Sequence, residues 1–277
     1  MRGLIAWLVL ATSLCAQPRR IVSTAPSITE TLFALGLGDA VVGVSQHCHY
    51  PPEAAKRPRV GAYLHPNVEA ILALRPDLVI VQDHTGQTAA QLRRVGIATL
   101  EIPHGNLETL FAGITAMGSR CGVPDRAAKL TAELRARLDA IRQRTAGKPR
   151  RSLVFIVGRT PGTLSDLIAV GKGSYLNELI EIAGGVNALA HTAMPYPKIS
   201  LESMIGLNPG VLVDMGDMAE TTGVTEEHKR TVVALWSQYP TLKAVKNGRV
   251  FAVASDIFVV PGPRVVDAAE AFEKMLR

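Results

Sequence analysis

The sequence predicts an α/β protein made of two lobes with parallel sheets, bridged by one long α-helix. Three observations lead to this prediction. Short β-branched runs alternate with helical patterns in both halves of the chain, as in parallel sheets that are covered by helices. Between the two halves, residues 125–145 contain no glycine and no proline. A helix–strand unit of the first half also recurs in the second half.

In the first half, residues 19–122, the alternation starts at once. Strands are expected at residues 21–23, 41–44, 78–81 and 97–102, and helices from Pro26 onward, at 68–74 and at 87–95. Ser27 and Glu30 have the S-x-x-E spacing of a capping box, which predicts that they close the start of the first helix. Gly36 and Gly38 are placed to end that helix.

The segment 123–147 is expected to form the bridging helix. Leu130, Leu134, Leu138 and Ile141 recur at helical spacing between charged residues, which predicts a helix of roughly 31 Å with one buried stripe. After it, residues 149–277 resume the β/α alternation with a strand at 153–157. The chain therefore divides into two α/β halves joined by one helix.

The two halves share a repeated unit. Residues 67–80 align without gaps on residues 200–213, and the pairs Glu69/Glu202 and Pro76/Pro209 are identical. A weaker match relates residues 27–38 to residues 174–185. Duplication of one α/β unit explains this pattern best. Two such lobes would enclose a cleft at the carboxyl ends of their strands, where folds of this kind bind ligands.

The composition is that of a folded globular protein. Of 277 residues, 47% are hydrophobic and 19% are charged, which excludes a disordered or collagen-like chain. This length is enough for two substantial cores. The net charge of +6 comes from 30 Lys and Arg against 24 Asp and Glu. These basic residues are spread along the chain, so we expect no nucleic-acid partner.

Residues 1–16 have the layout of a signal peptide. Arg2 gives a basic start, and an apolar run from Leu4 to Ala16 follows. This run is shorter than the about 20 residues of a membrane-spanning helix. We therefore expect cleavage before Gln17 and release into the periplasm. A lipid anchor on Cys15 is the alternative, but Leu14 is bulky where a lipobox needs a small residue.

Two cysteines, Cys48 and Cys121, remain after cleavage. Export invites a disulfide between them. However, Cys48 follows a predicted strand and Cys121 follows a predicted helix, which places them at opposite ends of a sheet. We therefore expect both thiols to stay unpaired.

The sequence contains none of the usual catalytic motifs. G-x-S-x-G, H-E-x-x-H, C-x-x-C, the Walker loop and G-x-G-x-x-G are all absent, so we expect a protein that is not an enzyme and has neither a metal nor a cofactor. Five histidines fall in loops after strands of the first half, namely His47, His49, His65, His84 and His104. Because those loops meet at one sheet edge, one imidazole could serve a ligand site. His47 and His49 also allow a distant alternative, a metal-dependent hydrolase.

Several segments resemble one protein family. They are Ile21-Val22-Ser23-Thr24-Ala25-Pro26-Ser27-Ile28-Thr29-Glu30, the stretch 42–53, Pro76-Asp77-Leu78-Val79-Ile80, the stretch 197–202, and Ser255-Asp256-Ile257-Phe258 with Pro263-Arg264. Together they resemble the periplasmic cobalamin-binding proteins of ABC importers, within the cobalamin and ferric-siderophore class of solute-binding proteins. The resemblance covers residues 20–277.

The resemblance implies a fold and a function. The fold is two Rossmann-like lobes bridged by one long α-helix, in agreement with the prediction from the residues. The function is capture of cobalamin or a related corrinoid between the lobes by a monomer, followed by delivery to an ABC permease dimer. Haem or a ferric siderophore is the alternative ligand of the same class. An anionic siderophore calls for arginines in the cleft, and Arg159 and Arg264 are the candidates.

The resemblance also implies site residues. The ligand cleft would be lined by aromatic side chains and one carboxylate, namely Tyr50, Tyr63, Tyr175, Tyr196, Phe258 and Asp256. Such rings suit a flat corrin, while polar groups fix its amide arms. His47 or His49, beside Tyr50, could replace the water on cobalt as an axial ligand. Glu69 and Glu202 match the two carboxylates that dock on the permease, one from each lobe.

Overall fold

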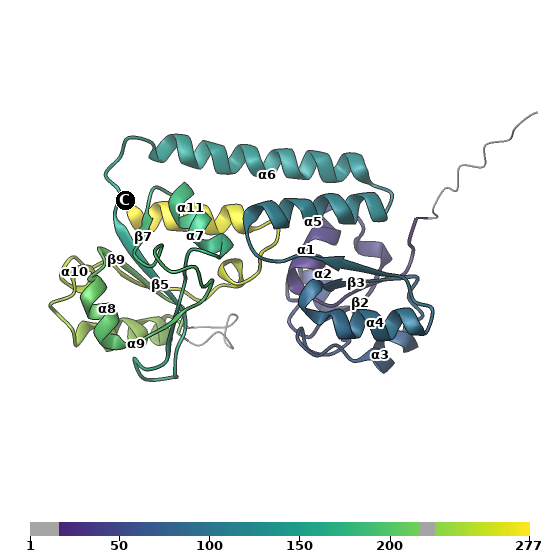
Figure 1. The fold of residues 1–277 in the computed structure, drawn as a ribbon, viewed down its shortest axis with the longest axis horizontal. Coiled ribbons are helices and arrows are strands. Elements are labelled where there is room, and N and C mark those ends of the chain that lie inside the picture. The colour runs from purple at the N-terminus through teal and green to yellow at the C-terminus, as the bar shows by residue number, and fades with distance from the viewer. Residues whose placement is uncertain (1–16, 217–224) are drawn as a thin grey trace, which may run out of the picture.

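The computed structural model describes residues 17–216 and 225–277. The expected signal peptide, residues 1–16 with Cys15, lies outside this part of the chain. The molecule has two sheets, one at each end of its long axis, and the helix α6 (Pro124–Thr145) runs above both (Figure 1). In the described residues, no helix is both long enough and apolar enough to cross a membrane.

The N-terminal lobe is built on a four-stranded sheet in which every strand is parallel. Its strands are β1 (Ile21–Ser23), β2 (Val41–Val44), β3 (Leu78–Gln82) and β4 (Thr99–Ile102), in the order β2-β1-β3-β4. Its helices are α1 (Pro26–Ala34), α2 (Pro52–Ala55), α3 (Val68–Ala73), α4 (Gly86–Arg94) and α5 (Leu107–Arg120). The expected strands and helices are confirmed, with ends that differ by one or two residues.

The two inner strands of this sheet, β1 and β3, are buried on both faces, whereas the edge strand β4 is partly exposed. Along β3, Ile80 packs into the core beneath α1 and α5, whereas Val79 and Val81 pack with Ile71 of α3 and Leu92 of α4. A parallel sheet covered on both sides requires such uninterrupted apolar strands. The carboxyl ends of the strands are left free to carry the loops of a site.

The C-terminal lobe holds a six-stranded sheet. Its strands are β5 (Ser152–Gly158), β6 (Leu167–Ala169), β7 (Val186–Asn187), β8 (Lys198–Ile199), β9 (Val211–Asp214) and β10 (Val250–Ala252), in the order β10-β9-β5-β6-β8, with β7 beside β5. Its helices are α7 (Tyr175–Ile182), α8 (Leu201–Leu207), α9 (Glu226–Ser237), α10 (Lys243–Lys246) and α11 (Val265–Leu276).

This second sheet differs in part from the expected parallel arrangement. β5, β7, β9 and β10 are parallel, but β6 runs antiparallel to β5, and β8 antiparallel to β6. The cause is the connection between β5 and β6, which spans only residues 159–166. A parallel crossover needs about a dozen residues or more, so this short loop returns the chain as a hairpin.

The repeated unit is visible in the backbone of both lobes. The side chain of Asn67 caps α3 by accepting a hydrogen bond from the backbone N–H three residues later. Ser200 caps α8 in the same way. Arg75 and Asn208, which are equivalent in the alignment, both have left-handed backbone with φ of 47° and 42°. Each copy therefore ends its helix with the same turn before the proline, which supports duplication.

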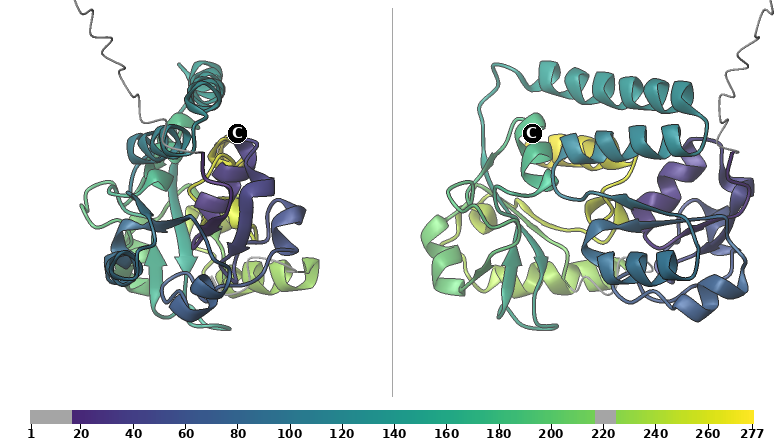
Figure 2. Two further views of the ribbon diagram at one scale, coloured as in Figure 1. Left: turned by 90° about the vertical axis from the view of Figure 1, so that its right-hand side faces the viewer. Right: turned by 45° about the vertical axis from the view of Figure 1, so that its right-hand side comes forward.

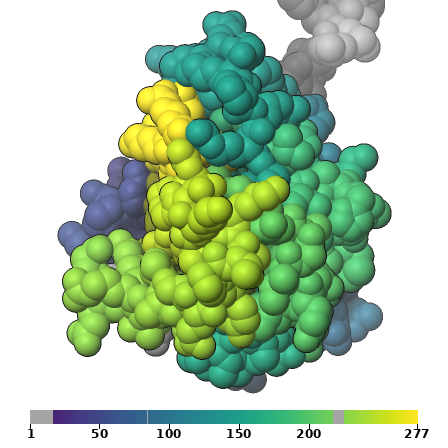
Figure 3. Space-filling model, turned by 90° about the vertical axis from the view of Figure 1, so that its left-hand side faces the viewer, coloured from purple at the N-terminus to yellow at the C-terminus, as the bar shows by residue number. Residues whose placement is uncertain are grey.

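The bridging helix shares one apolar core with both lobes. Leu134, Leu138 and Ile141 of α6 are buried in a cluster that also contains Ile80 of β3 and Phe155 of β5. α6 packs against α5, α7 and α11, and Figure 2 shows it lying along the top of the molecule. Seen from the end of the C-terminal lobe, α6 (teal) and α11 (yellow) lie side by side (Figure 3).

Cys48 and Cys121 are buried free thiols, as expected from their positions. The Sγ atom of Cys48 lies 3.1 Å from Oγ1 of Thr29 and 3.2 Å from Oγ of Ser45. Burial raises the pKa of Cys48 and also raises that of Cys121, to about 11. Both groups are therefore protonated at neutral pH and act as small core side chains.

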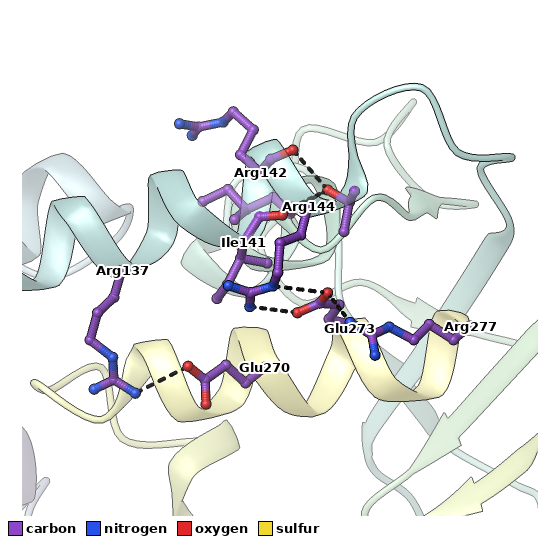
Figure 4. A network of polar contacts seen from close by, with 9 residues as sticks. Arg137, Ile141, Arg142, Arg144, Glu270, Glu273 and Arg277 are labelled. Atoms are coloured by element: carbon purple, nitrogen blue, oxygen red, sulfur yellow. Dashed lines mark hydrogen bonds and ion pairs between the residues drawn. The ribbon is translucent and has the colours of Figure 1, made fainter.

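A row of ion pairs joins α6 to α11 (Figure 4). Arg137 donates to Asp267 at 3.1 Å and to Glu270 at 3.2 Å. About two turns further along α6, Arg144 donates to Glu273 at 2.7 Å, and Arg277 donates to the same carboxylate at 2.5 Å. The Glu273 side chain is only 5% exposed. The guanidinium groups therefore compensate the cost of burying this charge.

We expect Glu273→Gln to destabilise the fold at neutral pH but not in acid. The hydrogen bond from Arg144 is the largest of the effects that lower the pKa of Glu273 to about 2. Because the folded-state pKa is depressed, the stabilisation exists above the unfolded value and is lost as pH falls from about 4.5 toward about 2. Since Arg144 is half-exposed, we expect only about 1 kcal/mol at pH 7. Denaturant unfolding at pH 7 and pH 3 measures it, and an equal loss at both pH values would contradict the ion-pair explanation.

Candidate ligand-binding site

Tyr63 is the first residue of the candidate site, and it belongs to the N-terminal lobe. It lies in the loop after α2, and its hydroxyl donates a 2.6 Å hydrogen bond to Oε1 of Gln82, at the end of β3. The amide of Gln82 in turn donates to Oγ of Ser27 at 2.9 Å. Burial, followed by the charge of Asp83 and then Tyr196, raises the pKa of Tyr63 to about 12. The phenol is therefore neutral and fixed in orientation.

Tyr196 approaches from the opposite lobe. It lies in the loop between β7 and β8 with its ring partly exposed, and burial of the hydroxyl raises its pKa to about 12. Tyr196 is also one of the groups that raise the pKa of Tyr63, which belongs to the other lobe. A small pocket is lined by Gln82, which accepts the hydrogen bond of Tyr63, by His104 of the same lobe and by Pro261 of the other lobe. The two predicted residues therefore lie on opposite lobes, within range of each other's electrostatic influence.

Tyr175 and Phe258 do not lie as the resemblance implied. They are 4% and 3% exposed, and both belong to the apolar core. The Tyr175 hydroxyl donates to the backbone carbonyl of Phe258 at 3.0 Å, and the Phe258 ring packs edge-on against Phe155. Tyr175 opens α7, whose first turn is covered by the loop of Phe258. In this structure neither ring exposes a face to a ligand, and both are part of the apolar core.

Asp256 belongs to an ion cluster that spans the two lobes. Its two carboxylate oxygens accept hydrogen bonds from Arg264 at 2.9 and 2.8 Å. The same guanidinium donates to Glu30 of α1, through Nε at 3.0 Å and also through a terminal nitrogen. The ring of Tyr50 lies over this guanidinium at 4.0 Å. We refer to Glu30, Asp256 and Arg264 as the interlobe ion cluster.

Sequence reasoning missed the role of Glu30. The capping box expected at Ser27 and Glu30 is wrong, because α1 begins at Pro26 after Ala25 and has no side-chain cap. Glu30 instead contacts Arg264, which is 234 residues away in the chain. No local pattern carries such a contact. The S-x-x-E spacing even favoured the incorrect interpretation.

The second candidate arginine is also neutralised. Arg159 follows β5, and its Nε donates to Oδ2 of Asp214 at 3.0 Å. Trp236 donates to the same oxygen at 2.6 Å, and the backbone of Gly216 donates to Oδ1 at 2.6 Å. Asp214 is fully buried. Arg159 and Arg264 are therefore both committed to carboxylates, and neither adds a net positive charge for an anionic ligand.

The histidines lie around the site at different depths. His47 and His49 are exposed on either side of the buried Cys48 and lead directly to Tyr50. Nδ1 of His104 contacts Oδ1 of Asp83 at 2.5 Å, and His65 is exposed in the loop after Tyr63. The side chain of His84 lies outside the description. Among the described residues, no group of three or more His, Cys, Asp and Glu side chains is placed to hold a metal ion.

Glu69 and Glu202 occupy equivalent places on opposite ends of the molecule. Each is exposed in the first turn of its helix, α3 or α8, and these helices lie away from α6 (Figure 1). A hydrogen bond with Ser200 lowers the pKa of Glu202. Both carboxylates face solvent. The geometry therefore gives one accessible acidic group on each lobe.

The two-lobed fold and its bridging helix match a known family. A family model described as periplasmic binding protein matches residues 21–257. The chain belongs to the periplasmic binding protein family. This confirms the family resemblance seen in the sequence, and it places the protein outside the cytoplasm.

Individual relatives agree with this assignment. The vitamin B12-binding protein of Vibrio cholerae is 30% identical over 270 residues, which cover 95% of this chain and 92% of the relative. The crystal structure of the periplasmic vitamin B12 binding protein of that species superposes with a TM-score of 0.76 at 29% identity, covering 94% of this chain and 97% of the other. An uncharacterized ABC transporter substrate-binding lipoprotein of Bacillus subtilis is 31% identical, covering 92% and 78%.

A haem-binding protein is similar to a comparable degree. The periplasmic heme-binding protein of Roseiflexus sp. RS-1 has a TM-score of 0.77 and 27% identity, covering 94% of this chain and 99% of the other. The relative from Bacillus subtilis is named a substrate-binding protein of an ABC transporter, and the others are named for the ligand that they bind. Proteins of this kind carry a small-molecule ligand and work with a permease.

Proposed function

We propose that this protein captures cobalamin or a related corrinoid between its lobes and delivers it to an ABC permease, without catalysing a reaction. The observations that carry the proposal are two neutral tyrosines from opposite lobes, Tyr63 and Tyr196, and two candidate arginines, Arg159 and Arg264, that are already paired with acids. A corrin is a flat, largely apolar ring with neutral amide arms. Aromatic faces and hydroxyl groups suit such a ligand better than free cations do.

Haem or a ferric siderophore is the second candidate, and the similarity to a haem-binding protein favours it. Two features of the site weigh against it. Arg159 and Arg264, the candidate partners for acidic ligand groups, are both neutralised by carboxylates. A tyrosinate ligand to ferric iron would also have to give up the proton that the Tyr63 hydroxyl donates to Oε1 of Gln82.

Thermal unfolding of the mature protein with cyanocobalamin, aquocobinamide or haemin tests the function. A ligand that binds only the folded state raises the melting temperature in proportion to RT ln(1 + [L]/Kd). We expect a clear rise with either corrinoid and little change with haemin. A rise in melting temperature with haemin alone would show that haem, the second candidate, is the ligand instead of a corrinoid. Turnover of ester or amide substrates that a chelator abolishes would instead support the hydrolase alternative at His47 and His49.

The proposed cellular setting follows from the expected leader. Cleavage before Gln17 would release a monomer into the periplasm, where it meets the permease dimer. A lipid anchor on Cys15 remains the alternative, and the relative from Bacillus subtilis is itself named a lipoprotein. Mass spectrometry of the exported protein distinguishes them, because a free N-terminal Gln17 requires cleavage after Ala16. No resident cofactor is needed for this function.

Axial ligation of cobalt by His47 or His49 is a further part of the proposal. Both imidazoles are exposed and adjoin Tyr50, and neutral imidazole is a good ligand for a metal with an exchangeable water. We expect aquocobinamide to shift its visible bands on binding, because an imidazole nitrogen replaces a water ligand. The double variant H47A/H49A should abolish the shift. Tight binding by the unsubstituted protein with no spectral change would exclude axial ligation.

A further inference from the structure

Glu30 is an acidic side chain of the N-terminal lobe that is held by the C-terminal lobe. It is 4% exposed, and its carboxylate accepts two hydrogen bonds from Arg264. The C-terminal backbone also approaches it closely, because a Cβ atom at Gly262 would lie 3.0 Å from Oε2 of Glu30. Glycine at position 262 therefore leaves room for this carboxylate. The contact between the lobes is built around Glu30.

Arg264 connects this buried acid to the ligand site. One guanidinium plane is shared by Glu30 on one side and Asp256 on the other. Tyr50 covers the face of that plane. A planar, bidentate group held by two carboxylates has little rotational freedom. The position of Arg264 therefore sets where the Tyr50 ring and the Asp256 carboxylate lie.

Burial makes this arrangement sensitive to the loss of either partner. Desolvation raises the pKa of Glu30, although the guanidinium of Arg264 acts in the opposite direction. Without the Glu30 charge, Arg264 would keep only Asp256, and that acid is in its own lobe. The guanidinium could then follow Asp256 and leave its place under Tyr50. Loss of one partner of a buried pair is costly mainly for the group left behind.

We propose that Glu30 is a positioning residue of the ligand site, acting through Arg264 on Tyr50 and Asp256. The inference rests on the proposed function, because it assigns Tyr50 to that site. Glu30 itself is too buried to contact a ligand. It ties the first helix of one lobe to the site residues of the other. Its effect on affinity is therefore transmitted through the interlobe ion cluster.

The binding experiment compares Glu30→Gln with a matched control, Glu273→Gln. Both acids are buried and bound by arginine, but Glu273 pairs with Arg144 and Arg277 and is not part of the interlobe ion cluster. We expect E30Q to weaken aquocobinamide binding about tenfold, as for loss of one coupled polar contact, mostly by faster dissociation. E273Q should lose stability while its affinity stays within about twofold. A similar affinity loss in both variants would overturn the proposal.

A double-mutant cycle tests the route through Tyr50. If Glu30 acts by fixing the ring over Arg264, its substitution should matter much less once the ring is gone. We therefore expect E30Q to cost little additional affinity in a Tyr50→Leu background. Glu30→Asp, which keeps the charge, should recover part of the loss. Full additivity of E30Q and Y50L would overturn this route.

A measurement on the ligand-free protein separates this inference from the proposed function. The Cζ atom of Arg264 lies 4.0 Å from the centre of the Tyr50 ring, and its Nε donates to Glu30, so the Nε–H NMR signal should exchange slowly with solvent and depend on both neighbours. R264K identifies the signal by removing it. Y50L should remove the ring-current part of its chemical shift, and E30Q should change the shift and speed exchange with solvent. If the unsubstituted protein binds no corrinoid, the function fails, while an unchanged Arg264 signal in E30Q would overturn the positioning role by itself.

Discussion

Replacing Glu69 and Glu202 together by alanine should abolish delivery to the permease while leaving ligand affinity nearly intact. Each acid is exposed in the first turn of α3 or α8, at opposite ends of the molecule. One exposed acidic side chain on each lobe suits a permease dimer that presents the same cationic surface twice. We expect the double variant to lose at least about tenfold in permease binding at low salt and less at high salt. Each single variant should fall between.

The matched control for this prediction is Glu227→Ala. Glu227 is also an exposed acid in the first turn of a helix, α9, so its removal costs the same favourable interaction with the helix dipole. Binding to permease in nanodiscs and uptake of labelled cobalamin are the measurements. Normal uptake by the double variant, or a tenfold loss of its ligand affinity, would refute the docking assignment.

Replacing Tyr63 and Tyr196 together by alanine should remove most of the ligand affinity. The pair supplies the aromatic faces of both lobes, and its hydroxyls are protonated donors at neutral pH. Large buried aromatic groups dominate binding energies, so a loss of about 100-fold or more is expected. Calorimetric titration with cyanocobalamin measures it.

The phenylalanine variants separate the ring from the hydroxyl. Tyr63→Phe keeps the ring but breaks the 2.6 Å hydrogen bond to Gln82, so it should lose fold stability as well as some affinity. Tyr196→Phe should have a smaller effect on stability, because its ring is partly exposed. If the double alanine variant binds cyanocobalamin within threefold of the unsubstituted protein, the ligand does not lie between these tyrosines.

Much of the fold follows from local patterns that the structure confirms. Both the β/α alternation of the first half and the long helix α6 depend on side-chain periodicity within a few residues. The repeated unit was also readable, because its caps at Asn67 and Ser200 are local features. The direction of β6 could not be predicted from the sequence, because it depends on how the short loop after β5 turns the chain back.

The site was only partly predictable for the same reason. Tyr63 and Tyr196 lie in loops, where an aromatic residue is free to face a ligand. Tyr175 and Phe258 carry the same residue types, but tertiary packing turns them into the core. Glu30 is the clearest failure, because its local spacing matched a cap while its partner, Arg264, comes from the far end of the chain. Contacts between distant segments leave no signal in periodicity.

The apolar core that runs beneath α6 has a consequence for how the protein unfolds. Leu134, Leu138 and Ile141 close the same cluster that holds Ile80 of one sheet and Phe155 of the other. Neither half can therefore complete its interior alone, even though each has its own sheet. We expect one cooperative transition instead of two, with the same midpoint by fluorescence and circular dichroism. A chain cut between residues 147 and 149 should leave two pieces that fold only when they are mixed.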